Sequence, residues 1–337
     1  MVQRSELPES WHFGAAAVVT PDGRRISHLG DPGIRTFFRS SAKPFQALPL
    51  VMALQAGEGG GLELDDADLG VICASHSGGP EHVERAASLL ERGGFGPADL
   101  QCGAHWPLGP AEAQALRESG GTPGPLHNNC SGKHAGMLLA CRVLGFAPES
   151  YLDPDHPLQR RIASELARFT GLEEDDLGRG IDGCSAPTFH LPLAAAARAW
   201  AKLAAPELAG LPQDVCRAVH RIVEAMGREP RMVAGEGRFT TRLAQVTGGR
   251  VVGKEGAEGI YTVAVRGPVA LGVAFKIADG AERARDGVAM ELLRQIGCLS
   301  GAEFDALREY YRPEIQNHRG LVVGRIVPDF ELEDEGP

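Results

Sequence analysis

Residues 250–276 read RVVGKEGAEGIYTVAVRGPVALGVAFK, and this stretch decides the fold class. It contains three short apolar runs, 251–256, 260–265 and 269–275, separated by glycine-containing breaks. Runs of this length that are rich in β-branched residues and bounded by glycine are typical of neighbouring strands. The stretch therefore predicts a group of strands in the C-terminal third of the chain.

A second strand signal lies near the N-terminus. The apolar run 15–19 leads into Pro21-Asp22-Gly23, and residues 25–29 follow as a return strand. Proline, aspartate and glycine favour a tight turn, so this segment predicts a hairpin. A last apolar run at 321–327 predicts the final strand. Strands at both ends of a chain form one sheet most economically, with the middle of the chain inserted as a separate cluster.

Helical periodicity dominates the middle of the chain, apart from a buried strand predicted at 69–74. Helices are expected from near Ser40, after Pro80, over 137–144 and 158–169, in the Ala-rich segment around Trp200, over 215–226, and over 288–296. We predict an α/β chain of the α+β class, with an antiparallel sheet from the termini and an inserted helical cluster. A single domain is expected over 1–337, with a sheet part of about 1–75 and 245–330 and a helical part of about 76–244.

Composition and charge exclude several classes of protein. The chain has 34 basic and 44 acidic residues, a net charge of −10, and no run of Lys and Arg, which argues against nucleic acid as a partner. The first ten residues lack the apolar core of a signal peptide, and no stretch reaches the roughly 18–20 apolar residues that span a bilayer. The seven cysteines do not resemble a secreted disulfide framework. We therefore expect a cytoplasmic protein with no membrane partner.

Ser40 and Lys43 form an S-x-x-K motif at the start of a predicted helix. That spacing places the hydroxyl and the amine on one face, within reach of each other. A serine becomes a nucleophile when a base removes its proton, and a half-buried lysine can have its pKa lowered enough to be that base. The spacing alone equally suits a capping serine and a solvated lysine.

Two further motifs strengthen the catalytic interpretation. Enzymes of the serine β-lactamase and penicillin-binding type combine S-x-x-K with a later serine motif and a still later lysine motif. Here Ser75-His76-Ser77 and Lys254-Glu255-Gly256 occur in that order, although the letters differ. Order and spacing predict a Ser/Lys amide or ester hydrolase.

Cys130 and Cys184 lie in two polar loops, one before a predicted helix and one following Asp182. A helix N-terminus stabilises a thiolate, and two thiolates with a nitrogen ligand suit zinc. A nucleophilic Cys130/His134 pair and two inert buried thiols are the alternatives. His76, His127, His134 and His190 lie in or beside the Ser, Cys and Asp loops, which suggests that these loops converge on one pocket, whereas His82, His156 and His220 lie on predicted helices.

Five segments together carry a resemblance to a known family. They are residues 39–46, 73–78, 128–137, 182–187 and 254–259, in this order along nearly the whole chain. In combination they resemble the L-asparaginase II family, of the Rhizobium etli type. The resemblance implies a fold similar to serine β-lactamases, hydrolysis of L-asparagine to L-aspartate and ammonia, and a homodimer.

The resemblance also implies roles for individual residues. It implies two catalytic pairs, Ser40 with Lys43 and Ser75 with Lys254. It implies a zinc ion held by Cys130, Lys133 and Cys184. Lysine is an unusual zinc ligand because its amine must lose a proton, and the metal itself would lower that pKa. Arg39, His134 and Asp182 are expected around the zinc and the substrate, and Ser77 is a further expected substrate contact.

Our starting hypothesis is that Ser40 attacks the side-chain amide after losing its proton to Lys43, with Ser75 and Lys254 as the second pair. Two alternatives stay open at this point. One is a metal-activated-water amidohydrolase acting on a related amino-acid amide. The other is an amino-acid-binding protein without turnover. One departure from the family is Gly79, at a position where an acidic residue is expected.

Overall fold

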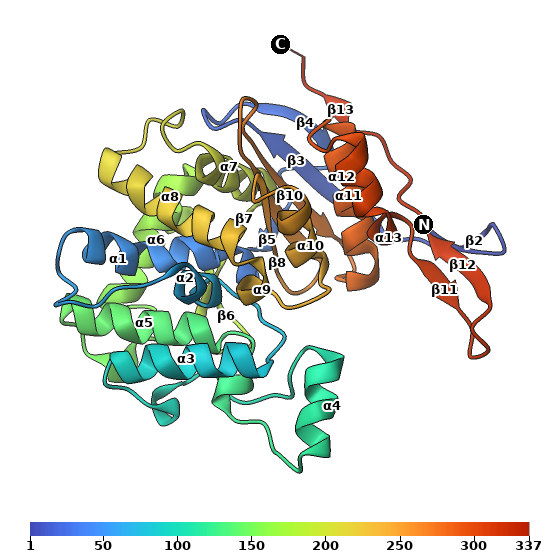
Figure 1. Cartoon of the computed structure of the whole chain (residues 1–337). Helices are drawn as coiled ribbons and strands as arrows, with labels where there is room; N and C mark the ends of the chain where they lie inside the picture. Colours follow the sequence, from blue (N-terminus) through green and yellow to red (C-terminus); the bar gives the residue numbers. More distant parts are fainter. Residues whose placement is uncertain (337) are drawn as a thin grey trace.

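The main sheet of the computed structural model has six antiparallel strands, and the structure describes residues 1–336. Its strands, in spatial order, are β13 (Glu333–Asp334), β4 (Arg25–Leu29), β3 (Gly14–Val19), β10 (Leu271–Ile277), β9 (Ile260–Val265) and β8 (Val251–Glu255). The predicted hairpin is therefore β3–β4, and the strands of 250–276 pair with it through β10. The chain ends do build one antiparallel sheet, and the α+β class is confirmed (Figure 1).

Both faces of this sheet are covered, because successive side chains of a strand point to opposite faces. Along β3, Ala15, Ala17 and Val19 join the core shared with the helical part, whereas Ala16 and Val18 join a second core. Helix α7 (Leu193–Ala204) packs against β10 and β3 on the first face. Helices α10 (Phe239–Val246) and α11 (Arg285–Gln295) contribute to the second core, which α12 (Gly301–Ala306) and α13 (Arg308–Tyr311) extend.

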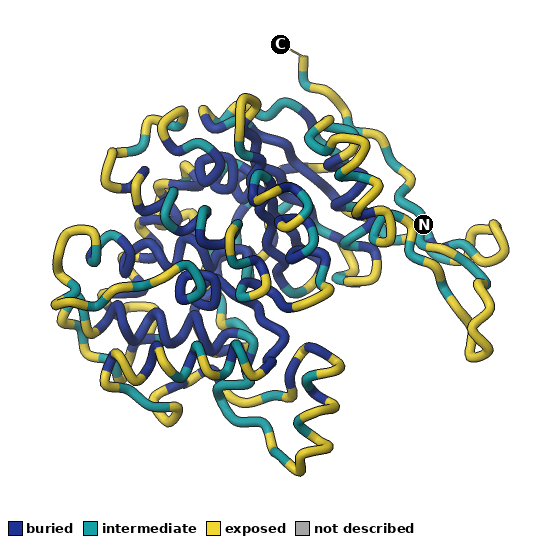
Figure 2. Tube along the Cα trace, viewed as in Figure 1, coloured by how far each residue is buried: buried dark blue, intermediate teal, exposed yellow. Residues whose placement is uncertain are grey.

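The middle of the chain forms the helical part, whose core is buried as deeply as the sheet (Figure 2). Its helices are α1 (Lys43–Gln55), α2 (Asp66–Ile72), α3 (Pro80–Arg92), α4 (Pro110–Glu118), α5 (Ser131–Leu144), α6 (Pro157–Thr170), α8 (Gln213–Arg228) and α9 (Pro230–Val233). Helix α4 stands apart from the others, and Ala113 is its one buried residue (Figures 1 and 2). No helix within residues 1–336 is long and apolar enough to cross a membrane.

Two smaller sheets correct the expectation of a single sheet. The predicted final strand, β12 (Val322–Ile326), pairs with β1 (Val2–Arg4) and β11 (Glu314–Gln316), and β2 (Leu7–Ser10) completes a sheet at the side of the molecule. The third sheet contains β5 (Arg35–Phe37), β7 (Pro187–Pro192) and β6 (Gly178–Ile181). These strands have three to six residues, too short for a clear alternation of polar and apolar positions.

The strand predicted at 69–74 is wrong, because this run is the end of helix α2. Asp65 caps the helix by accepting from the Asp68 backbone N–H at 2.8 Å, and the Asp68 carboxylate accepts from Asp65 N at 3.1 Å. A reciprocal cap of this kind starts a helix, and a short apolar run alone does not distinguish a buried strand from a buried helix. The helix predicted from near Ser40 also begins later: residues Arg39–Ala42 form a 3-10 turn and α1 starts at Lys43.

Candidate active site

A cavity of about 730 Å³ lies where the helical part meets the sheet part. One wall comes from Ser40, Ser75, Ser77, Asn129 and the first turn of α4, and the other from residues that follow α9, the end of β8, Glu282 and Arg285. Segments far apart in the sequence therefore converge here, among them both serine motifs and Asn129 of the Cys130 loop. The Asp182 loop and the four histidines noted beside these loops do not line the cavity. Of the four residues expected to be catalytic, Ser40 and Ser75 line this cavity directly.

Ser75 is held between two lysine amines. Its Oγ accepts from Lys254 Nζ at 2.7 Å and from Lys43 Nζ at 3.1 Å. Lys43 Nζ also donates to the Ala74 carbonyl, and Lys254 Nζ donates to the Glu255 carbonyl at 2.9 Å. The structure thus brings Ser75 together with Lys254, and it brings Lys43 to Ser75 as well. Within residues 1–336 the Lys43 amine makes no hydrogen bond to the Ser40 hydroxyl; the Lys43 backbone N–H donates to the Ser40 carbonyl.

Lys254 has the electrostatics of a general base. It is fully buried, and burial lowers the pKa of its amine to about 7 against the opposing attraction of Glu255, with Lys43 adding to the depression. A base works best when its pKa lies near the working pH. The neutral amine is therefore well populated near neutral pH.

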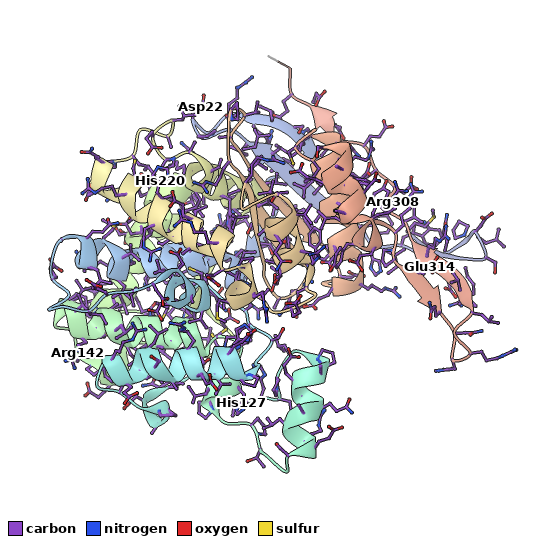
Figure 3. All side chains as sticks on the ribbon, in the orientation of Figure 1. Asp22, His127, Arg142, His220, Arg308 and Glu314 are labelled. Atoms are coloured by element: carbon purple, nitrogen blue, oxygen red, sulfur yellow. The ribbon has the colours of Figure 1, made fainter. Side chains whose placement is uncertain are left out.

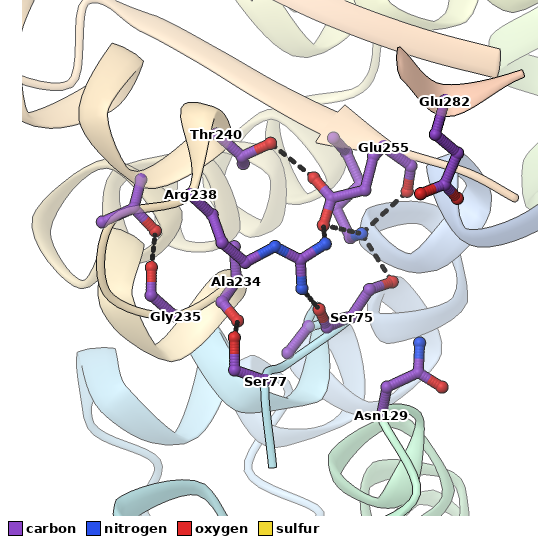
Figure 4. Close-up of polar contacts among 12 residues, drawn as sticks. Ser75, Ser77, Asn129, Ala234, Gly235, Arg238, Thr240, Glu255 and Glu282 are labelled. Atoms are coloured by element: carbon purple, nitrogen blue, oxygen red, sulfur yellow. Dashed lines mark hydrogen bonds and ion pairs between the residues drawn. The ribbon is translucent and has the colours of Figure 1, made fainter. Parts of the chain in front are cut away.

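Glu255 and Arg238 hold this arrangement in place (Figure 4). The Glu255 carboxylate accepts from Arg238 Nη2 at 2.8 Å and from the Thr240 hydroxyl, and lies 3.8 Å from Lys254 Nζ. Burial alone would raise the pKa of this carboxyl, but Lys254 and Arg238 outweigh burial and lower it. Arg238 Nη1 donates to the Ser75 carbonyl at 2.8 Å, so Ser75 is fixed at its backbone as well as at its hydroxyl.

Ser40 approaches the same cavity on a strained stretch of backbone. Arg39 has a φ of 50°, a left-handed conformation that is uncommon for a residue with a side chain. A Cβ on Gly256 would lie 3.2 Å from the Arg39 Cβ and 3.3 Å from the Phe38 carbonyl, so the absence of a side chain at Gly256 lets β8 pass close to this turn. The Ser41 hydroxyl donates to the Lys254 carbonyl at 3.1 Å, which ties the turn to β8.

The other expected substrate contacts lie at different depths. The Ser77 hydroxyl lines the cavity and donates to the Ala234 carbonyl at 3.1 Å (Figure 4). Arg39 and Asp182 form an ion pair at 3.0 Å, and this hydrogen bond keeps the pKa of Asp182 below its usual value although burial acts in the other direction. His134 is fully buried, and its Nδ1 hydrogen-bonds the Tyr151 hydroxyl at 2.7 Å. His134 therefore packs behind the site and does not line the cavity.

The three residues expected to bind zinc do lie together. Lys133 Nζ donates to Cys184 Sγ at 2.9 Å. The neighbouring Cys184, with Lys43 and Lys133, lowers the pKa of Cys130, whereas Cys130 and burial raise the pKa of Cys184. Burial acts to lower the pKa of Lys133, but negative charge on Cys184 and Cys130 outweighs burial and raises it. Lys43 Nζ lies 3.2 Å from Cys130 Sγ, which connects this triad to Ser75.

The donor atoms of this triad suit zinc, since two sulfurs and one amine nitrogen converge in a buried place. Within residues 1–336, His, Cys, Asp and Glu side chains form no group of three that could hold a metal. The amine of Lys133 is thus needed as the third donor of this site.

Several residues of the cavity were not identified from the sequence. Arg238 follows no motif and could not have been found, whereas Glu255 stands directly after Lys254 inside a motif that was noted. Glu112 is the third: a Cβ on Gly79 would lie 3.4 Å from its Cγ. The Glu112 side chain from α4 thus lies near Gly79, the position where an acidic residue was expected.

Two histidines and three cysteines do not line the cavity. His220 on α8 hydrogen-bonds Glu207 at 2.6 Å at the edge of the molecule, and His127 lies beside α4 (Figure 3). Burial raises the pKa of Cys73, Cys141 and Cys298 to about 12, as is typical of unreactive thiols in a core.

Comparison with known proteins gives three findings. The family model described as L-asparaginase II matches residues 1–328. No curated protein gives a significant match. The chain is similar to a solved structure described as "Crystal Structure Analysis of Mglu in its native form", with 13% identity and a TM-score of 0.41, over 88% of this chain and 63% of that one. A second, "Crystal Structure Analysis of Mglu", has 14% identity and a TM-score of 0.34, over 80% and 62%. The chain thus spans less than two thirds of the length of these two structures.

Proposed function

The chain belongs to the L-asparaginase II family, and from this membership we propose that it hydrolyses L-asparagine to L-aspartate and ammonia. The observation that supports a Ser/Lys mechanism is the position of the Ser75 hydroxyl, 2.7 Å from Lys254 and 3.1 Å from Lys43. A nucleophile and its base at hydrogen-bond distance, with the base oriented by a third group, are the signature of covalent catalysis.

We assign the attack to Ser75, whereas our starting hypothesis gave it to Ser40. The neutral Lys254 amine takes the Ser75 proton as Oγ bonds to the side-chain carbonyl carbon of asparagine. The amide nitrogen then leaves as ammonia, carrying the proton that Lys254 returns. Water cleaves the resulting ester, which releases aspartate and restores the Ser75 hydroxyl. The Lys43 amine, which also donates to Ser75 Oγ, stabilises the negative charge that develops beside it.

Ser40 has a supporting role in this scheme. Its side chain lines the cavity, and no lysine amine of the described chain hydrogen-bonds it. We propose that its hydroxyl donates to the substrate. Arg39, Asp182 and Ser77 stay predictions as further substrate-binding residues, and His134 is proposed to support the wall through Tyr151.

The assignment is tested by comparing Ser75→Ala with Ser40→Ala. Loss of the nucleophile is expected to lower kcat for ammonia release about a thousandfold or more, and loss of a supporting hydroxyl about 10- to 100-fold. Acid quenching during turnover, followed by peptide mass spectrometry, should find the aspartyl ester on the Ser75 peptide. Ser88→Ala, on the exposed face of α3, is the control. An ester on the Ser40 peptide would overturn the assignment.

We further propose that Cys130, Lys133 and Cys184 hold zinc. When bound there, zinc supplies a fixed positive charge close to Lys43 and Ser75. Purified protein should contain about one zinc per chain by elemental analysis, and Cys184→Ser should lose most of it because sulfur is the preferred ligand. Cys216→Ser, whose thiol lies on α8 away from the triad, should retain it. Equal zinc content in the two variants would contradict the assignment.

Three finer expectations remain proposals. They are the Rhizobium etli type with its fold similar to serine β-lactamases, the homodimer, and the cytoplasmic location. The two alternative functions are separated by the same assays. Thermal stabilisation by asparagine without ammonia release would indicate a binding protein, and turnover unaffected by loss of Ser75 and Ser40 would indicate metal-activated water.

A further inference from the structure

We infer that Glu112 binds the α-ammonium group of the substrate and thereby selects free amino acids. This inference rests on the proposed function, since it concerns how the same cavity reads asparagine. Glu112 lies in the first turn of α4 and lines the cavity together with Ser75 and Ser77.

Glu112 differs from the other carboxylates of the cavity in having no partner. Glu255 is satisfied by Arg238 and Thr240, Glu236 pairs with Arg231 at 3.1 Å, and Glu282 lies 3.8 Å from Arg285. Within residues 1–336, Glu112 makes no side-chain hydrogen bond and no ion pair. A carboxylate at the wall of the cavity that pairs with no cation of the chain is available to a cationic group of a ligand.

The position of Glu112 is fixed relative to the serines. A Cβ on Gly109 would lie 1.9 Å from Glu112 Oε2 and 3.0 Å from the Ser77 Cβ, so the carboxylate lies over the Gly109 backbone beside Ser77. The Gly109 N–H donates to the Ser77 carbonyl at 2.9 Å, which attaches the start of α4 to the Ser75–Ser77 segment. Glu112 is therefore held near Ser77, two residues beyond the reactive hydroxyl.

This spacing matches the length of asparagine. Two residues of chain span at most about 7 Å, which limits the separation of Ser75 and Ser77. A substrate carbonyl carbon in position for attack lies about 3–3.5 Å from Ser75 Oγ. The α-nitrogen is three bonds further along, roughly 3–4 Å away. An asparagine bound through its side-chain amide at Ser75 can therefore place its α-ammonium beside Ser77, within reach of Glu112.

The test compares Glu112→Gln with Glu118→Gln, an exposed position on the same helix. Only Ala113 of α4 is buried, so neither change disturbs the core. For Glu112→Gln we expect KM for L-asparagine to rise about 10- to 100-fold, the value of a lost charged hydrogen bond, with kcat changed less than about threefold. Glu118→Gln should behave as wild type.

Substrate preference is the decisive measurement, because a merely structural role of Glu112 would leave this preference unchanged. Succinamic acid is asparagine without its α-ammonium group. Wild type should prefer L-asparagine to succinamic acid in kcat/KM by about tenfold or more, and Glu112→Gln should lose that preference. Binding of L-aspartate by calorimetry should weaken in parallel, and this measurement does not depend on turnover.

A rescue sharpens the test. Gly79 has a φ of −70°, and the three atoms nearest to its Cβ would belong to Glu112 and His82, at 3.4 Å or more, so a Cβ fits at this position. Gly79→Glu in a Glu112→Ala background should restore the preference for L-asparagine.

The inference is overturned if Glu112→Gln retains both wild-type KM and wild-type preference, an outcome that leaves asparagine hydrolysis by wild type untouched. If wild type releases no ammonia yet loses aspartate binding on Glu112→Gln, the proposed function fails and the inference holds. Absence of both turnover and aspartate binding in wild type would overturn both.

Discussion

Lys254 shows how a single buried residue sets the chemistry. Because burial lowers the pKa of its amine to about 7, the amine is charged below that pH and cannot accept the Ser75 proton. We therefore expect kcat/KM to fall about tenfold per pH unit below pH 7 and to level off above it. A pH–rate profile with L-asparagine measures this limb.

The control for this profile is a second lysine with a lowered pKa. Burial lowers the pKa of Lys202 to about 8, but Lys202 lies on α7 outside the cavity and donates to the Arg168 carbonyl. Lys202→Met should keep the acidic limb in place, whereas Lys254→Met should abolish activity. A profile that stays flat well below pH 7 would exclude Lys254 as the base.

The sequence predicted that the Ser and Lys residues lie close together, but not always which serine each lysine amine contacts. The spacing of Ser40 and Lys43 placed them on one helix face, yet α1 begins only at Lys43 and Ser40 lies on the preceding 3-10 turn. The amine of Lys43 extends instead to Ser75, because the loop after α2 passes beside α1. Spacing along a helix is local information, whereas the direction of a long side chain depends on tertiary packing.

At the level of elements, Asp68 explains why α2 forms where a strand was predicted. Its buried carboxylate accepts from Arg92 Nη2 at 2.7 Å and Arg85 Nη1 at 3.2 Å, and so joins the start of α2 to α3. Breaking a fully buried ion pair costs about 3–5 kcal/mol, and both arginines are partly exposed. We expect Asp68→Ala to lower the free energy of unfolding by about 2–3 kcal/mol in urea titrations.

The comparison for Asp68 is Glu84→Ala, an exposed acid on α3 without an ion pair in the described structure. It should change the free energy of unfolding by less than about 0.5 kcal/mol. Similar losses in both variants would show that Asp68 contributes no more than a surface charge.

For the whole molecule, the cavity lies at the junction of a helical part and a sheet part. The turn at Ser40, the start of α1 and the loop at Ser75 come from the helical part, although the sequence assigned residues 1–75 to the sheet part. Lys254 and Glu255 come from β8. The alternation of strand-rich ends and a helical middle predicted a sheet part and a helical part, but not that α1 and α2 pack with the helices. The small sheets and α4 were not predicted, because their short or exposed segments carry little periodic signal, and α4 brings Glu112.

Gly272 tests whether the two parts must fit closely for catalysis. A Cβ at this position of β10 would lie 2.1 Å from both the Ala197 carbonyl oxygen and the Ala201 nitrogen of α7. Gly272→Ala must therefore push α7 away from the sheet, and we expect a loss of about 3 kcal/mol, at the upper end for overpacking. Helix α7 also holds the turn before α1, since Trp200 Nε1 donates to the Ser41 carbonyl at 3.2 Å.

Displacement of α7 should for this reason move Ser40 relative to Lys254 and lower kcat as well as stability. Misplacement of reacting groups by about 1 Å can cost about 100-fold. Thermal unfolding and ammonia release measure the two effects, and Gly301→Ala, where a Cβ meets open space, is the matched control. If Gly272→Ala loses stability but keeps wild-type kcat at a temperature where it is folded, the contact of α7 with β10 supports the fold without positioning the site.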